Sequence, residues 1–134
     1  IVTDPALDNT THISTTVVNG VALLTGEVSN EEQKLRAAKI ANSYQGVDQV
    51  VNELAILGKS SFTSRTNDSL ITAKVKTELL RSKEVNASNI KVVTERSVVY
   101  LMGIVGQQEG DMAVNLAKQV GGVQRIVKIF MPSA

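Results

Sequence analysis

Side chains able to bind phosphate and apolar groups lie together in one stretch, TNDSLITAKVKTELLRSKEV, which runs from Thr66 to Val85. At about 100° per residue, Ile71, Val75 and Leu79 fall on one face of a helix. Other apolar side chains fall outside that face, beside cations that can bind phosphate groups. The helix therefore combines a core-facing stripe with a basic surface that also carries apolar residues: Leu70, Ala73, Lys74, Lys76, Leu80 and Arg81.

The formal net charge of the 134-residue chain is only +1, but the charge is distributed unevenly. Residues 1–58 contain three cations and seven acids, or −4, whereas residues 59–83 contain six cations and two acids, or +4. The excess positive charge therefore lies on this helix and on the segment before it. Aromatic residues make up only 3% of the chain, so the stacking platforms of nucleic-acid-binding proteins are missing and we expect no nucleic-acid partner.

Candidates for catalysis or metal binding are few. The chain has no cysteine, which excludes disulfides, cysteine nucleophiles and thiolate metal sites. Asp4 and Asp8 precede His12, but the sequence has no second histidine to complete a metal site. We therefore interpret His12 as a solvated residue at the start of a strand. Glu31 and Glu32 fit the first turn of a helix, where the helix dipole favours acids, so we expect no catalytic residue, metal or cofactor and no enzyme activity.

The sequence contains two copies of one unit. HISTTVVNGVALLTGEV at 12–28 aligns with NIKVVTERSVVYLMGIV at 89–105 at a spacing of 77 residues. GVDQVVNEL at 46–54 aligns with GVQRIVKIF at 122–130 at a spacing of 76, so the second copy is one residue shorter between these blocks. Each copy predicts two strands joined by a tight turn, then a helix, then a third strand.

Turn residues and glycines support this order of elements. Asn19-Gly20 is a strong signal for a two-residue hairpin, because both turn positions need positive φ. Arg96-Ser97 is a poorer turn at the same place in the second copy. The glycines of LLTGEV and YLMGIV lie inside predicted strands, where glycine often permits a bend or a close approach of two backbones.

A helix follows the second strand of each copy. In the first copy the cap and first turn are at 29–32, and the expected apolar positions are Leu35, Ala38, Ile40 and Ala41. In the second copy they are Met112, Ala113, Leu116, Ala117 and Val120. Only the second copy also shows a helix before its first strand, for which Asn67 or Asp68 is the expected cap. The first copy has a dozen residues there, so it lacks this leading helix or does not show it.

We divide the chain into a first module at 1–57, a linker at 58–66 and a second module at 67–134. The fold class is α+β, with each module a mixed three-stranded sheet packed against helices. No run of 18 uncharged apolar residues is present, so we expect no membrane-spanning helix.

These motifs resemble the BON domain, an αββαβ unit. The matching segments are LLTGEV and GVDQVVNEL in the first copy, and YLMGIV and GVQRIVKIF in the second. Two such modules in tandem, the second opened by NDSLITAKVKTELL, are similar to dual BON-domain outer-membrane lipoproteins of the DolP type. The resemblance covers nearly the whole chain.

The resemblance implies a non-enzymatic module of the Gram-negative periplasm, anchored at the inner face of the outer membrane through a lipidated N-terminal cysteine. It implies binding to an anionic phospholipid membrane surface (phosphatidylglycerol or cardiolipin), in support of envelope integrity and division-site function, with envelope or division proteins as further partners. The anchor cysteine is absent from this chain, so anchoring rests on the resemblance alone. Such proteins can carry an aromatic residue where this chain has Leu70, which inserts less strongly at an interface.

The resemblance also places lipid contact on the basic helix. We expect its apolar side chains to enter the acyl boundary while its cations meet lipid phosphates. The expected lipid-binding residues are Leu70, Ala73, Lys74, Lys76, Thr77, Leu80 and Arg81. Glu78 is expected at the flank, paired with Lys74 or Arg81.

Two alternatives to lipid binding stay open. In the first, Leu70 is a scattered surface residue without a function. In the second, the same surface or an unpaired strand edge contacts a protein, as in a periplasmic protein-interaction module or a chaperone-like stress factor. Lipid binding predicts a salt-dependent preference for anionic vesicles, whereas protein docking predicts saturable binding without lipid.

Overall fold

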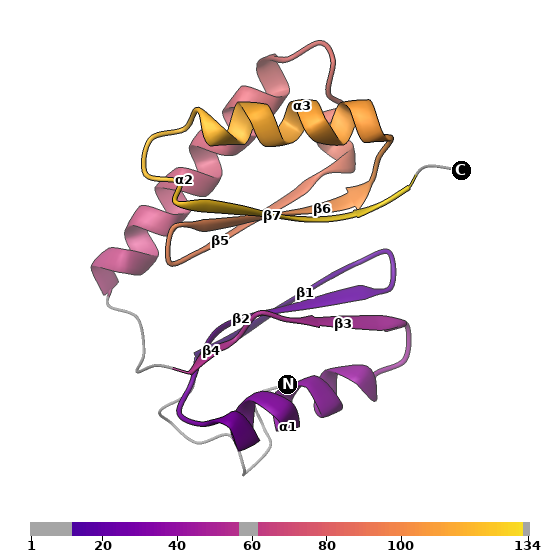
Figure 1. Cartoon of the computed structure of the whole chain (residues 1–134), viewed down its shortest axis with the longest axis vertical. Coiled ribbons are helices and arrows are strands. Elements are labelled where there is room, and N and C mark those ends of the chain that lie inside the picture. Colours follow the sequence, from indigo (N-terminus) through magenta and orange to yellow (C-terminus); the bar gives the residue numbers. More distant parts are fainter. Residues whose placement is uncertain (1–11, 57–61, 133–134) are drawn as a thin grey trace. The chain divides into compact units, whose positions relative to one another are not determined.

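The computed structural model describes residues 12–56 and 62–132, with side chains from residue 66 onward in the second range. The chain divides into two units, Ile1–Ser61 and Phe62–Ala134, and each unit has its own sheet (Figure 1). Both sheets contain antiparallel and parallel pairs and pack against helices, which confirms the α+β fold class. No helix within the described residues is long and apolar enough to cross a bilayer.

The first unit has a helix on one face of a mixed sheet (Figure 1). β2 is central: β1 pairs with it antiparallel, while β3 and β4 pair with it in parallel along its other edge, in a single register. β1 begins at the first described residue, so residues 1–11, where a leading helix was in question, lie outside the described part of the chain. The elements are β1 (His12–Val18), β2 (Val21–Val28), α1 (Glu31–Asn42), β3 (Gln49–Asn52) and β4 (Ala55–Ile56).

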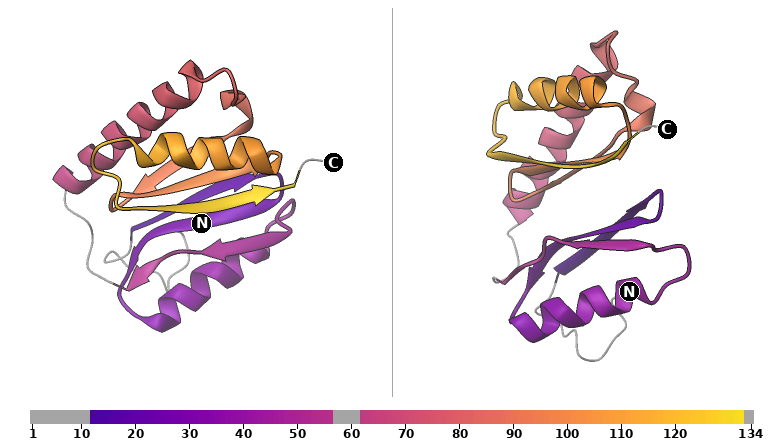
Figure 2. Two further views of the ribbon diagram at one scale, coloured as in Figure 1. Left: turned by 45° about the horizontal axis from the view of Figure 1, so that its top comes forward. Right: turned by 45° about the vertical axis from the view of Figure 1, so that its right-hand side comes forward.

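The second unit has the strand order β5-β6-β7, with β5 antiparallel and β7 parallel to β6. Two helices, α2 and α3, cover the same face of this sheet (Figure 2). The elements are α2 (Phe62–Arg81), a short 3-10 helix η1 (Ala87–Asn89), β5 (Lys91–Glu95), β6 (Val98–Ile104), α3 (Gln107–Lys118) and β7 (Arg125–Met131).

The strand registers confirm the internal repeat. Val18 faces Val21 in the first hairpin, and Glu95 faces Val98 in the second, so both hairpins have two-residue turns at a spacing of 77 residues. In the parallel pairs, Val21 faces Gln49 whereas Val98 faces Arg125, so the connection through α3 is one residue shorter than that through α1.

The first turn of α1 is capped as expected. The side-chain oxygen of Asn30 accepts a hydrogen bond from the Gln33 amide at 2.8 Å, and Gln33 Oε1 accepts one from the Ser29 amide at 2.7 Å. The expectation that Leu35 faces the core is wrong, since its side chain is 62% exposed. The buried stripe instead runs through Ala37. Leu35 is two positions from Ala37 and therefore lies about 200° around the helix from it.

The expected core face of α2 is confirmed. Ile71, Val75 and Leu79 are buried and belong to one cluster with the strands and α3. Ala113 and Ala117 are the completely buried residues of α3 in that cluster, and their small side chains let the helix approach the sheet closely. This packing fixes which side of α2 faces solvent.

The strand glycines are required by geometry. Gly26 has φ +118° and Gly103 has φ +148°, a region that L side chains rarely adopt. A Cβ at Gly26 would collide with the carbonyl oxygen of His12, and a Cβ at Gly103 with that of Asn89. Both copies therefore use glycine to let a neighbouring backbone approach the second strand, as expected from the sequence.

α2 begins earlier than expected. Residues 62–66, assigned to the linker, belong to this helix, and residues 57–61 lie outside the described part of the chain. The expectation of a cap at Asn67 or Asp68 is wrong, because both lie inside the helix.

Asp68 instead stabilises the second hairpin turn. Its buried carboxylate accepts hydrogen bonds from the amides of Arg96 (2.8 Å) and Ser97 (2.9 Å). These two residues have φ +51° and +65°, which costs about 1–2 kcal/mol for each non-glycine residue. The corresponding turn in the first unit is Asn19-Gly20, which adopts positive φ readily, so the second copy replaces a local turn signal with a contact from α2.

We expect Gly103→Ala to destabilise the second unit by more than about 3 kcal/mol, because it combines an unfavourable φ with a collision against backbone. Gly46→Ala is the matched control: φ is +91° there, but no atom lies within 4 Å of an added Cβ. Its expected cost is about 1 kcal/mol. Chemical denaturation measures both changes, and equal costs would show that the collision is relieved without penalty.

We expect Asp68→Ala to lower the free energy of unfolding by about 2–4 kcal/mol, because it removes two charge-assisted hydrogen bonds. Introducing Asn-Gly at the turn, as Arg96→Asn with Ser97→Gly, is expected to reduce that loss, since the turn then forms without help. A double-mutant cycle measures the coupling, and additive effects would show that Asp68 does not act through the turn.

Candidate functional site

The structure places all seven expected lipid-binding residues on the solvent-exposed side of α2. Leu70 is 54% and Leu80 is 74% exposed, an unusual condition for two leucines on one helix. We call this set the exposed face of α2: Leu70, Ala73, Lys74, Lys76, Thr77, Leu80 and Arg81. Its position follows from the burial of Ile71, Val75 and Leu79 on the other side of the helix.

Part of this face forms one wall of a groove with a volume of about 460 Å³. The opposite wall is Gln119, Val120 and Gly121, at the end of α3 and the start of the connection to β7. On the α2 side the groove is lined by Leu70, Ala73, Lys74, Thr77 and Glu78. We call it the α2 groove. It brings together four of the seven expected residues, whereas Lys76, Leu80 and Arg81 lie outside its lining.

The groove residues that follow α3, Gln119–Gly121, were missed by sequence reasoning. They lie about forty positions from α2 in the chain, and no local pattern links the two segments. The observed packing of α3 beside α2 is the only signal that places Gln119–Gly121 at the groove.

Charges on the exposed face of α2 differ in their partners. Glu78 Oε2 lies 3.3 Å from Arg81 Nη1, which confirms one of the two expected pairings. Within the described residues no ion pair holds Lys74 or Lys76. The Thr77 hydroxyl donates to the Ala73 carbonyl oxygen at 2.9 Å, so it is engaged within its own helix. Lys74 is therefore the cation of the groove lining that is available to a ligand.

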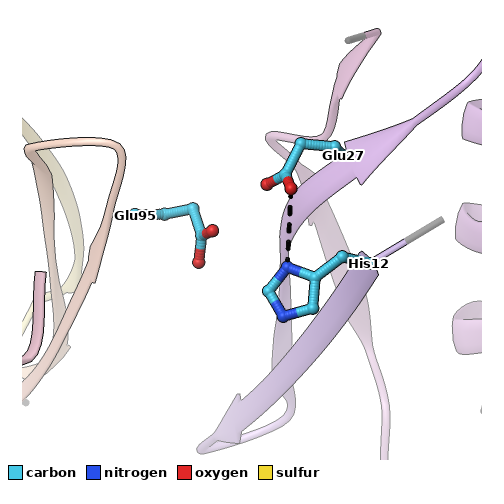
Figure 3. Close-up of side chains that lie close together, drawn as sticks. All are labelled: His12, Glu27 and Glu95. Atoms are coloured by element: carbon cyan, nitrogen blue, oxygen red, sulfur yellow. Dashed lines mark ion pairs between the residues drawn. The ribbon is translucent and has the colours of Figure 1, made fainter. Parts of the chain in front are cut away.

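His12 is not simply a solvated residue at a strand start. Its Nδ1 lies 3.6 Å from Oε1 of Glu27, the residue directly opposite on β2 (Figure 3). The Glu27 side chain is completely buried, and it was not among the residues expected to be functional. The equivalent positions in the second copy are Asn89 and Ile104, so the module fold does not require this pair. Asp4 and Asp8 lie outside the described residues.

The α2 groove has the chemistry to hold an anionic amphiphile. Lys74 supplies a positive charge at its lining, and Leu70, Ala73 and Val120 supply apolar surface. Binding pockets for small molecules commonly combine a mostly apolar lining with a few polar groups that fix orientation.

Sequence comparison shows which proteins this chain is similar to. The family model for the BON domain matches residues 1–58 and again residues 67–129. The chain is 36% identical over 112 residues to the outer membrane lipoprotein DolP of Haemophilus influenzae, a match that covers 84% of this chain and 58% of the relative.

Two further relatives match over similar lengths. The 21 kDa hemolysin of Actinobacillus pleuropneumoniae is 31% identical, with 95% of this chain and 66% of the relative covered. Osmotically-inducible protein Y of Escherichia coli is 32% identical, with 87% of this chain and 59% of the relative covered. The chain therefore spans about three fifths to two thirds of the length of these three relatives.

We expect the exposed leucines to contribute little to stability. Leu70→Ser and Leu80→Ser should change the free energy of unfolding by less than about 0.5 kcal/mol, as for other surface substitutions. Leu79→Ala, next to Leu80 but buried, should cost about 2–5 kcal/mol. Thermal or denaturant unfolding measures all three, and a large loss for Leu80→Ser would show that this side chain is packed in solution.

Proposed function

The chain belongs to the BON-domain family, and on that premise we propose that it is a non-enzymatic module that binds an anionic phospholipid surface through the exposed face of α2. The ligands we propose are phosphatidylglycerol or cardiolipin. The proposed binding residues are those expected from the sequence: Leu70, Ala73, Lys74, Lys76, Thr77, Leu80 and Arg81.

One observation carries this proposal. Leu70 and Leu80 are largely exposed on a helix whose opposite side is buried, and the cations between and beside them include Lys74, which no acid neutralises in the described structure. A helix that presents apolar and basic side chains together can lie in the interface of a membrane. If Leu70 were only a scattered surface residue, there would be no reason to expect a second exposed leucine and cations on the same side of the helix.

The expected affinity is low but sufficient for a tethered protein. Each cation near an anionic surface contributes about 1 kcal/mol, and inserting a leucine side chain adds about 2 kcal/mol. Arg81 contributes less than a free cation, since Glu78 lies beside it. Two weak membrane signals combine when a lipid anchor holds the protein near the surface, because the second binding event becomes intramolecular.

We place the protein in the bacterial envelope, at the periplasmic face of the outer membrane. The similarity to the outer membrane lipoprotein DolP supports this location. A lipid anchor, a contribution to envelope integrity and division, and contacts with envelope proteins are parts of the same proposal.

A protein-interaction or stress-related function is the second candidate. The similarity to osmotically-inducible protein Y favours it, and β7 forms one edge of the β5-β6-β7 sheet, where a partner strand can pair. Such a function predicts saturable binding to a protein in the absence of lipid, whereas lipid binding predicts dependence on anionic vesicles.

We expect Leu70→Glu to abolish binding to phosphatidylglycerol vesicles while leaving the protein folded, because it places a carboxylate among the lipid phosphates. Leu35→Glu is the matched control: it adds the same charge at an exposed leucine of α1, far from α2 in sequence. Vesicle cosedimentation at low and high salt measures binding, and circular dichroism checks the fold.

Higher salt should weaken binding of the unchanged protein to anionic vesicles. Leu35→Glu should bind like the unchanged protein. Normal binding by a folded Leu70→Glu variant would exclude the exposed face of α2 as the binding surface. If the unchanged protein bound no vesicles at all, lipid binding would be excluded and the protein-interaction function would be favoured.

A further inference from the structure

Gly121 and Gly122 lie in the connection between α3 and β7, but they differ in why glycine is present. Gly122 has φ +95°, a conformation that favours glycine. Gly121 does not have positive φ, so its backbone accepts any L residue. The conformational requirement that explains Gly122 therefore does not explain its neighbour.

Packing does not explain Gly121 either. A Cβ at Gly110 would press on the ring of Phe130, and a Cβ at Gly103 would collide with backbone. A Cβ at Gly121 meets no atom within 4 Å. At such a position glycine is less stabilising than alanine, because its unfolded chain has more conformations to lose.

The first copy shows that the module tolerates a side chain at this place. At the spacing of 76 residues, Gly121 corresponds to Gln45, which is exposed in the first unit. The fold thus accepts a long polar side chain directly before the positive-φ glycine, which is Gly46 in one copy and Gly122 in the other.

What distinguishes Gly121 is its place in the lining of the α2 groove, which it shares with Leu70 and Lys74. A side chain there would occupy space that is open in this structure. We propose that Gly121 is a specificity-determining residue, kept without a side chain so that the glycerol and first acyl carbons of an anionic phospholipid enter the α2 groove while its phosphate lies at Lys74.

The lining matches that ligand. Leu70, Ala73 and Val120 offer apolar surface to methylene groups, and the Thr77 hydroxyl is already engaged with its own helix. The acid of the lining, Glu78, is paired with Arg81 at 3.3 Å, which reduces its repulsion of a phosphate. The segment 59–83 carries the excess positive charge of the chain, six cations against two acids, which complements a phosphodiester. This inference rests on the proposed function and adds to it that the lipid enters a groove instead of meeting only the outer surface of α2.

Substitution at Gly121 tests the inference with phosphatidylglycerol vesicles in a phosphatidylcholine background. Gly121→Gln copies the residue of the first unit and adds a long side chain at the groove lining, so if the lipid enters there the vesicle affinity should fall at least about tenfold. Gly121→Ala adds one methyl group and should reduce affinity much less. Both variants should unfold at the same or a higher denaturant concentration than the unchanged protein.

Leu70→Glu, measured in parallel, separates this inference from the proposed function. If Leu70→Glu loses binding but Gly121→Gln binds normally, the helix surface binds lipid and the groove does not admit it. A lower unfolding midpoint for Gly121→Ala would also overturn the inference, because glycine would then have a structural function. If the unchanged protein does not bind the vesicles, both proposals fall.

Discussion

The packing of Ile71, Val75 and Leu79 against the second sheet is the constraint on which the candidate site depends. These three side chains fix the rotation of α2 about its axis, and every other side chain of the helix takes its direction from them. The exposure of Leu70 and Leu80 is therefore enforced by the core. The same packing aligns α2 with the end of α3, so the groove is a product of how the unit folds.

Much of the fold could be predicted because its signals are local or repeated. The 77-residue spacing located both hairpins, Asn19-Gly20 identified a turn, and the spacing of Ile71, Val75 and Leu79 identified the buried face of α2. The start of α2 was placed too late, since Asn67 and Asp68 look like caps when only neighbouring residues are considered. Leu35 was expected in the core because leucine is apolar, but it lies about 200° around the helix from the buried Ala37 and is exposed.

The candidate site was predictable on one side only. Residues of α2 share a periodicity that can be read from the sequence, whereas Gln119–Gly121 and the bond between Asp68 and the second turn join segments far apart in the chain. Non-local contacts of this kind depend on the packing of whole elements. Glu27 is different, because the two-residue turn at Asn19-Gly20 fixes the register that places it opposite His12, and only its complete burial depends on the rest of the unit.

The two hairpins also differ in how their turns are stabilised, with consequences for the order of folding. Asn19-Gly20 can form its turn from its own conformational preference, so the β1–β2 hairpin can begin to fold before distant segments arrive. The β5–β6 turn needs a carboxylate from a helix 28 residues earlier in the chain. That pairing adds loop-closure entropy to the folding barrier, so the first hairpin can serve as a local nucleus while the second is stabilised only as its whole unit assembles.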